Sequence, residues 1–322
     1  MQFAFTGDQL AFRDAVRDLL AKECSPSVVR AAWSNADGRS GSAWRALGEM
    51  GVLGALVSEG AGGLGLNELD VVLLAEEAGR AALPEPFVEH MLVGAPLAIA
   101  EHPDVVNGAM TVSAGDPVIP YGAAADVIVV LAPDAQLALG SGTTLEALAS
   151  VDASRRLTRL VGARSSRPLL RDEISVAFWR GTLGYSAQLL GLARQMLDMT
   201  VVYATERRQF GSPIGSFQAI KHQLANVRIA LEFAAPLVYR AAHSLATGDP
   251  DAALHCSMGK AQAADAAMLA ASTALQCHGA IGYSYEHDLH LWMKRTWALA
   301  GAWGDAAWHR DRVARAILDR PA

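Results

Sequence analysis

The sequence has few cysteines and no long apolar run, and these absences exclude several classes of protein. Cys24, Cys256 and Cys277 are the three cysteines, and without a C-x-x-C pair they predict free thiols rather than a disulfide framework or a zinc site. No apolar run reaches the about 18 uninterrupted residues that a membrane-spanning helix needs. The first residues, MQFAFTGDQLAFRD, lack the basic start and long apolar run of a signal peptide. We therefore expect a cytoplasmic protein without membrane insertion.

Positive charge is scarce as well. Lys and Arg number 27 against 33 Asp and Glu, a formal net charge of −6, and no block of basic residues forms a stripe, so nucleic acid is not an expected partner. Apolar residues make up 52% and charged residues 19%, which excludes a disordered chain. Because 322 residues exceed the about 100–200 of a typical domain, two or three compact units are expected.

Helical periodicity predominates near the N-terminus. Apolar residues recur three and four positions apart over residues 8–21, and Thr6 or Asp8 is available as the N-cap. Further helices are predicted over residues 43–56 and 67–82, and two prolines end the last of them.

The helical pattern gives way to a β pattern after residue 109 and returns near residue 172. Short β-rich runs at 125–131, 135–139 and 157–161 alternate with Gly, Pro and Asp, which predicts a small β module. Later helices are predicted at about 217–238, 249–277 and 285–297, with a last one from about 305. The predicted fold is mainly α, with three domains: N-terminal helical (1–109), β module (110–172) and C-terminal helical bundle (173–322).

One glycine pattern suggests a dinucleotide site. Residues 60–65 read GAGGLG, match G-x-G-x-x-G and precede a helix, with Glu85 about twenty residues further on. However, the segment Ala82–Pro86 contains two prolines and cannot supply the second strand of a βαβ unit. The preferred interpretation is a turn between helices, with Asn67 capping the next helix.

Two later segments carry a family resemblance. Residues 203–222 read YATERRQFGSPIGSFQAIKH, and residues 276–291 read QCHGAIGYSYEHDLHL. Both resemble the motifs of acyl-CoA dehydrogenases, flavoenzymes that desaturate acyl-CoA thioesters between Cα and Cβ. LGEMGV at 47–52 and GGLG at 62–65 resemble that family too, so the likeness covers nearly the whole chain. It implies a mainly α acyl-CoA dehydrogenase-like fold whose C-terminal part is a four-helix bundle.

The resemblance implies contacts with FAD, bound mainly by a neighbouring subunit. Arginine binds phosphate oxygens bidentately, and a glycine turn lets backbone amides approach a pyrophosphate. By resemblance the first motif contacts FAD through Arg207, Gln209, Phe210, Phe217 and Gln218. The second motif meets the adenosine end of a cofactor across another interface through Gln276, Gly279, Ala280 and Gly282.

The pair His287 and His290, beside Glu286, raises the question of a metal. Residues i and i+3 share a face of a helix, and the side chains of histidine and glutamate both bind zinc. Without a third convergent ligand we predict no metal site, and the resemblance assigns these residues to the start of a helix.

The sequence departs from the family where catalysis needs a base. Active members require a carboxylate for the Cα proton and donors for the thioester carbonyl. By the family pattern the base falls on Trp303, which cannot accept a proton, or on Ile174 at the alternative position. Glu173 and Asp305 are the nearby acids, although a first-turn acid stabilised by the helix dipole and an N-cap are the simpler interpretations.

The β module also departs from the family pattern. The Thr/Ser-rich strand that touches the flavin ring and the preceding Gly-Ser-Asp loop are not found, and only the later part of the family domain is recognised, around Tyr121–Arg156. This combination resembles the short subunits of heteromeric α2β2 acyl-CoA dehydrogenases, in which two chains share each FAD and one supplies the base. The resemblance implies a longer catalytic subunit as partner, an acyl-CoA substrate such as a steroid side-chain thioester, and an electron-transfer flavoprotein as acceptor.

Three hypotheses stay open at this point. The chain completes the FAD site of a longer partner, or it is a self-sufficient homomeric dehydrogenase using Glu173 or Asp305. The third is a structural or regulatory helical bundle without a cofactor.

Overall fold

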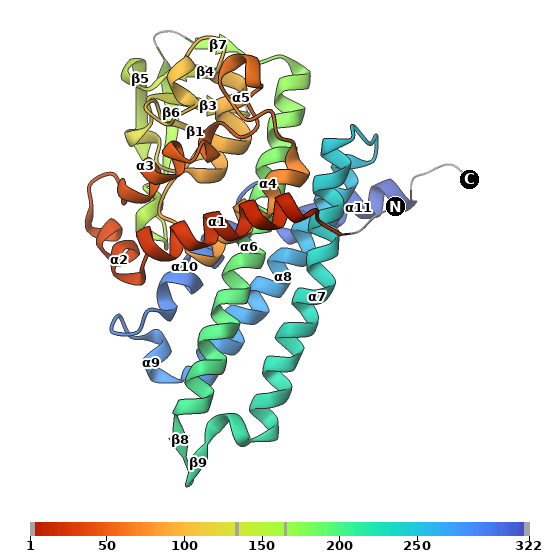
Figure 1. The fold of residues 1–322 in the computed structure, drawn as a ribbon. Coiled ribbons are helices and arrows are strands. Elements are labelled where there is room, and N and C mark those ends of the chain that lie inside the picture. Colours follow the sequence, from red (N-terminus) through yellow and green to blue (C-terminus); the bar gives the residue numbers. More distant parts are fainter. Residues whose placement is uncertain (1–3, 133–134, 164–165, 319–322) are drawn as a thin grey trace.

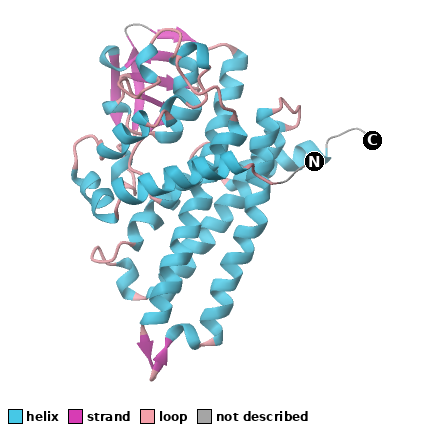
Figure 2. Ribbon diagram, viewed as in Figure 1, coloured by secondary structure: helices cyan, strands magenta, loops and turns pink. Residues whose placement is uncertain are grey.

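Two helical regions flank a small β module along the chain, and the module lies at one end of the molecule (Figures 1 and 2). The computed structural model describes residues 4–132, 135–163 and 166–318. The predicted fold class, mainly α with a small β module, is confirmed. The domain boundaries at residues 109 and 172 stay predictions.

The N-terminal region is built from helices with clear end signals. Thr6 caps the first helix, because its hydroxyl accepts from Gln9 N–H and the Gln9 side chain accepts from Thr6 N–H. The helix predicted over residues 43–56 is wrong beyond Glu49, since Gly51 adopts a left-handed φ of 79° and ends it. The helices of this region are α1 (Gly7–Glu23), α2 (Pro26–Ser34), α3 (Ser42–Glu49), α4 (Glu68–Arg80) and α5 (Ala95–Ala98).

The glycine-rich segment is a turn between helices. It begins with a 3-10 helix over Glu59–Ala61, and Gly62 follows at a φ of 88°. Asn67 then caps α4 by accepting from the N–H groups of Leu69 and Asp70. Within residues 4–111 the structure has no strand, so a βαβ unit is absent there and the turn interpretation is confirmed.

The β module consists of two small sheets. The first has the order β1-β3-β4-β7, with β1 and β3 parallel and the other pairs antiparallel. The second has the order β2-β6-β5 and is antiparallel. The strands are β1 (Val112–Gly115), β2 (Val118–Ile119), β3 (Val127–Val130), β4 (Gln136–Leu139), β5 (Thr143–Ala147), β6 (Thr158–Ala163) and β7 (Ser166–Pro168). The sequence predicted β3, β4 and β6, and missed β1, β2, β5 and β7.

Long helices dominate the C-terminal region, where α6, α7 and α8 run side by side (Figure 1). The helix predicted over residues 285–297 begins only at Leu289. The side chains of Ser284 and His287 accept from the N–H groups of Glu286 and Leu289, and such bonds compete with the helix. The helices are α6 (Arg171–Glu206), α7 (Gln218–Ala246), α8 (Ala252–His278), α9 (Ala280–Tyr283), α10 (Leu289–Ala300) and α11 (Ala306–Leu318).

Glycines bring α4 and α6 into near backbone contact. A Cβ atom on Gly191 of α6 would lie 1.9 Å from the carbonyl oxygen of Glu76 in α4. A Cβ atom on Gly79 of α4 would lie 2.1 Å from the carbonyl oxygen of Gln188 in α6. The two helices can approach this closely only because neither glycine has a side chain.

A buried arginine joins all three regions. Arg295 of α10 donates to the carboxylate of Asp152 (2.7 Å) and to the hydroxyl of Ser154 (2.6 Å), both between β5 and β6. It also donates to the hydroxyl of Tyr121 in the β module and to the carbonyl oxygen of Leu83 in the N-terminal region. Because the guanidinium group is buried, these bonds replace its hydration.

Candidate functional site

The first motif forms the connection between α6 and α7. Arg207 is the C-cap residue of α6, and a short hairpin follows, with β8 (Arg208–Gln209) paired to β9 (Ser212–Pro213). A 3-10 helix over Ile214–Ser216 then leads into α7. This hairpin projects from the tip of the long helices, at the end away from the β module (Figure 1).

Phe210 stands at the turn of the hairpin in an unusual conformation. Phe210 and Gly211 have φ angles of 51° and 80°, so both turn residues are left-handed. Such turns favour Asn and Gly, and the left-handed region costs another residue about 1–2 kcal/mol. The Phe210 side chain is nevertheless 94% exposed, with an edge contact to Phe217 as its ring neighbour. Packing within this chain therefore does not account for the aromatic residue there.

The polar residues of the first motif also face outward. Arg207, Gln209 and Gln218 are exposed. Within residues 4–132, 135–163 and 166–318 no carboxylate forms an ion pair with Arg207. The Gln209 side chain donates to the carbonyl oxygen of Arg208 (2.8 Å), which keeps it on the hairpin. The Arg207 guanidinium group is therefore available to an anion from another molecule.

The second motif ends α8 at the same tip. Gln276 is exposed in the last turn of α8, and Gly279 ends the helix at a φ of 63°. Gly279 and Ala280 are exposed, whereas Gly282 is buried, and a Cβ atom on Gly282 would lie 2.8 Å from the Cβ atom of His278. The contact of Gly282 with a cofactor stays a prediction.

Tyr203 and His278 hold the two motifs together, although the sequence predicted no site role for either residue. Their rings stack with centroids 4.2 Å apart, and the Tyr203 hydroxyl donates to the His278 carbonyl oxygen. We call the exposed surface formed by residues 206–218 and 276–280 the bundle tip. The signal that could have found the pair is an aromatic residue within each motif at the two helix ends that meet.

Glu173 is occupied by structural partners. Glu173 lies in the first turn of α6, where its carboxylate accepts from the N–H of Leu170 (2.7 Å) and pairs with Arg167 of β7 (3.0 Å). Desolvation raises the pKa of Glu173, but these two donors outweigh it and lower the pKa below its ordinary value. A carboxylate with a lowered pKa is a poor proton acceptor.

Asp305 has an N-cap contact. Its carboxylate accepts from the N–H of Trp308 (2.8 Å) in the first turn of α11. Trp303, where the resemblance predicts the base, is buried, and its indole ring lies over Gly181 of α6. The structure thus assigns helix-end contacts to both acidic candidates, and their roles in catalysis stay predictions.

The histidine pair does not share a helix, contrary to the spacing argument. α10 begins at Leu289, so His287 lies before it and His290 within it. His287 Nδ1 accepts from Leu289 N–H, and His290 Nδ1 donates to the carbonyl oxygen of His287. In the described part of the chain no three His, Cys, Asp or Glu side chains come together as metal ligands.

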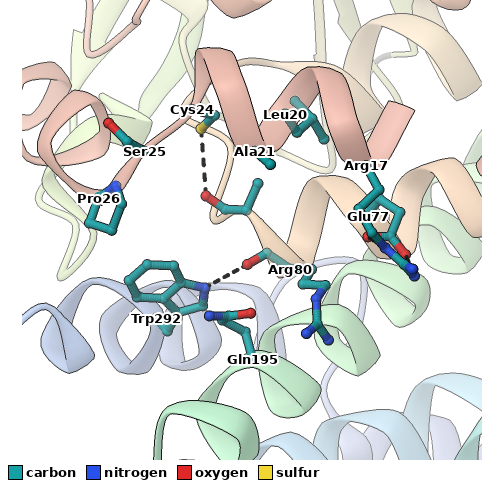
Figure 3. Close-up of a pocket in the computed structure, with 11 residues that line it drawn as sticks. Arg17, Leu20, Ala21, Cys24, Ser25, Pro26, Glu77, Arg80, Gln195 and Trp292 are labelled. Atoms are coloured by element: carbon teal, nitrogen blue, oxygen red, sulfur yellow. Dashed lines mark hydrogen bonds and ion pairs between the residues drawn. The ribbon is translucent and has the colours of Figure 1, made fainter. Parts of the chain in front are cut away.

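A pocket of about 250 Å³ lies between α1, α4, α6 and α10 (Figure 3). Its charged side chains are paired, Arg17 with Glu77 and Arg80 with Asp198. The indole N–H of Trp292 donates to the carbonyl oxygen of Arg80 (2.9 Å), and burial raises the pKa of the Cys24 thiol to about 12. The pocket therefore offers neither a free charge nor a reactive thiolate.

Lys260 is buried beneath the loop that carries Trp303. Its ammonium group donates to the carbonyl oxygens of Ala300 (3.0 Å) and Gly304 (2.8 Å). Burial lowers its pKa from 10.5 to about 7. Between these values the unfolded chain binds a proton that the folded chain does not, so the stability that Lys260 contributes rises with pH across this window.

We expect this effect to appear as a difference between the wild type and Lys260→Met. The free energy of unfolding of the wild type, relative to the variant, should rise by about 1 kcal/mol per pH unit between about pH 7 and pH 9. Urea unfolding at several pH values measures this free energy for both proteins. Subtracting the values of the variant from those of the wild type removes the contribution of the cysteines and tyrosines, which titrate in both. A difference that stays constant with pH would contradict the lowered pKa.

No helix among residues 4–132, 135–163 and 166–318 is long and apolar enough to cross a membrane.

The three-region architecture is that of a class of dehydrogenases known from solved structures. The chain resembles a chain of the ChsE4-ChsE5 complex from Mycobacterium tuberculosis with a TM-score of 0.90 and 22% identity, and all of each chain is covered. The steroid acyl-CoA dehydrogenase Tcur3481-Tcur3483, in its G363A variant, matches with a TM-score of 0.85 and 22% identity, covering 97% of this chain and 98% of that one. At this identity the likeness shows the fold.

Sequence comparison gives the family. Residues 6–102 match the model of the acyl-CoA dehydrogenase N-terminal domain, and residues 174–318 match that of the C-terminal domain. The acyl-CoA dehydrogenase IpdE2 of Mycobacterium tuberculosis is 34% identical over 292 residues, which cover 88% of this chain and 89% of IpdE2. The chain belongs to the acyl-CoA dehydrogenase family, whose cofactor is FAD, and the resemblance predicted from the motifs is confirmed.

Proposed function

We propose that this chain is the non-catalytic subunit of an α2β2 acyl-CoA dehydrogenase and completes the FAD site of a longer catalytic partner. The observation that carries the proposal is a contrast within one bundle. The motif residues Arg207 and Phe210 are exposed, and no described carboxylate forms an ion pair with Arg207, whereas position 303 holds a buried indole. This contrast supports a chain that keeps cofactor contacts and lacks the expected base.

The residues at the bundle tip fit a flavin dinucleotide. Arg207 offers a guanidinium group that has no ion-pair partner in the described part of the chain, and the exposed ring of Phe210 offers a face for a planar ring. Gln209 and Gln276 add amide groups to the same surface. When bound, FAD accepts the hydride from Cβ, and this chain would hold and orient it without removing the Cα proton.

The substrate and partners follow from the relatives. The solved structures with this fold include the ChsE4-ChsE5 complex and a steroid acyl-CoA dehydrogenase with two named components. These names favour a heteromer and a steroid acyl-CoA as substrate. We further propose that the partner is a longer subunit and that the substrate is a CoA thioester of a steroid side chain. An electron-transfer flavoprotein is the proposed electron acceptor.

Flavin content distinguishes the proposal from its alternatives. The chain purified alone should lack flavin, and the complex with its longer partner should hold about one FAD per pair of chains. Flavin absorbance per mole of protein measures this for the chain alone and with each candidate partner. Full flavin occupancy and dehydrogenation by the chain alone would sink the proposal.

The homomeric alternative depends on Glu173 or Asp305. The double variant Glu173→Gln with Asp305→Asn should leave dehydrogenation by the native complex unchanged, because both carboxylates serve helix ends. Loss of activity with retained flavin would favour the alternative.

Arg207→Ala should weaken FAD binding by the complex about ten- to a hundredfold, since a charged hydrogen bond contributes about 1.5–3 kcal/mol. Titration of the flavin-free complex with FAD measures it. Arg228→Ala is the matched control, because Arg228 is also exposed but lies on α7 outside the bundle tip and pairs with Glu232. Unchanged flavin affinity in Arg207→Ala would favour a structural bundle without a cofactor.

A further inference from the structure

We propose that the stacked rings of Tyr203 and His278 fix the separation of the two cofactor motifs, and so make the shared site specific for a dinucleotide flavin rather than a mononucleotide. The inference rests on the proposed function, with Arg207 at the pyrophosphate of FAD and Gln276 at its adenosine end. It goes further, because it assigns the choice between FAD and FMN to two positioning residues that act through the motifs.

Each ring of the stack belongs to a residue that is joined directly to one motif contact. The carbonyl oxygen of Tyr203 accepts from the N–H of Arg207 (2.8 Å), the C-cap residue of α6. His278 is the last residue of α8, between Gln276 and the C-cap residue Gly279. A displacement of either ring therefore moves the backbone that carries one set of the predicted cofactor contacts.

The stack is the aromatic contact between these two helix ends. The ring centroids lie 4.2 Å apart with the planes inclined by 20°, and the Tyr203 hydroxyl donates to the carbonyl oxygen of His278 (3.4 Å). Over residues 200–206 of α6 the buried side chains are Thr200 and Ala204, and both are small. Tyr203 thus supplies the large side chain by which this end of α6 contacts the end of α8.

The His278 ring is held in one orientation. His278 is 4% exposed, and its Nδ1 donates to the carbonyl oxygen of Ala274 (2.8 Å). The ring of His287 meets it edge-on, with centroids 4.7 Å apart, and His287 is fixed in turn by accepting from the N–H of Leu289. Burial lowers the pKa of His278 below its ordinary value, so the ring is neutral near pH 7 and this arrangement is kept.

A fixed separation favours the longer cofactor. FMN ends in one phosphate, whereas FAD continues through a pyrophosphate to adenosine. Arg207 alone would contact a phosphate of either flavin, but Gln276 reaches a group that FAD alone carries. Contacts that are already in place before binding cost less ordering, so holding both residues at the right separation strengthens FAD binding and leaves FMN binding unaffected.

The test uses the complex of this chain with its longer partner, freed of flavin and titrated separately with FAD and FMN. Tyr203→Ala should weaken FAD binding about two- to tenfold, the range expected for one aromatic stack, and should leave the FMN affinity unchanged. Tyr203→Phe keeps the ring and should bind FAD as the wild type does. Arg207→Ala, in contrast, should weaken the binding of both flavins, because both carry a phosphate.

Two further variants separate positioning from a general loss of stability. Phe178→Ala removes a ring contact with Trp179 (centroids 4.8 Å apart) from the other end of α6 and should leave both affinities unchanged. The double variant Tyr203→Ala with His278→Ala should bind FAD no more weakly than the weaker single variant, because all three lack the same stack.

Unchanged FAD affinity in Tyr203→Ala, an equal loss of FAD and FMN affinity, or additive losses in the double variant would each overturn the inference. If FMN binds too weakly to measure, the double variant decides. If Tyr203→Ala does not fold, Tyr203→Leu keeps an apolar side chain without a ring, and the same comparisons apply. A negative result for Tyr203 while Arg207→Ala still weakens FAD binding would leave the proposed function intact.

Discussion

Replacing Asp152 by alanine is expected to destabilise the protein by about 3–5 kcal/mol, because the change leaves a buried guanidinium charge without its counter-ion. Asp152 is 1% exposed and accepts from Arg295 at 2.7 Å and from Ser154. Arg295 cannot regain water, since it is fixed by the β module and the N-terminal region at once. The loss therefore affects the contact among all three regions.

Urea unfolding of the purified chain measures this loss. Glu146→Ala is the matched control, because the pair of Glu146 with Arg159 is 52% exposed on both sides and should contribute less than about 1 kcal/mol. A loss similar to that of the control would show that the cluster is not a structural element.

The pH dependence of Asp152 has a defined sign. Burial raises its pKa, but the Arg295 guanidinium group and the hydrogen bonds outweigh it and lower the pKa in the folded chain. The contribution to stability is therefore fully present above the ordinary aspartate pKa of about 4 and is lost as the pH falls through the lowered value. The wild type should lose its advantage over Asp152→Ala in that acid range.

Gly191→Ala should be the next most damaging change, with a loss of about 3 kcal/mol in the free energy of unfolding. The new methyl group would lie 1.9 Å from a backbone carbonyl oxygen of α4, which cannot rotate away as a side chain can. The helices α4 and α6 must separate, and separation opens the core between the N-terminal region and the bundle.

Gly7→Ala is the control for the glycine change. Gly7 lies in the first turn of α1 with no atom within 4 Å of a Cβ, so the change should alter stability by less than about 1 kcal/mol. Thermal and urea unfolding of both variants measure the contrast. A tolerated Gly191→Ala would mean that the two helices are not held at backbone contact.

Much of the helical pattern could be predicted from the sequence because it depends on neighbours along the chain. The 3.6-residue periodicity and the caps at Thr6 and Asn67 are local signals, and both caps are present. The predictions failed where a single residue or a side chain changed a local balance, as Gly51 did at the end of α3. Three of the four missed strands gave little sequence signal, because β2 and β7 are very short and β5 is mostly exposed.

The candidate site, too, could be predicted only in part from the sequence. The sequence selected Arg207, Phe210 and Gln276 from motif likeness, but it did not select the stack of Tyr203 on His278 that brings the two motifs to one tip. That stack joins residues 75 positions apart, and no periodicity or spacing reports such a contact.

The sequence by itself determined the family, the order of helical and β regions, and the absence of a carboxylate at position 303. These properties depend on residue identity and on spacing along the chain. Only the tertiary structure decided that the indole at that position is buried over Gly181, that Glu173 and Asp305 are engaged at helix ends, and that Arg207 is exposed without an ion-pair partner in the described chain. Burial and pairing arise when distant segments pack together, so they are properties of the folded arrangement.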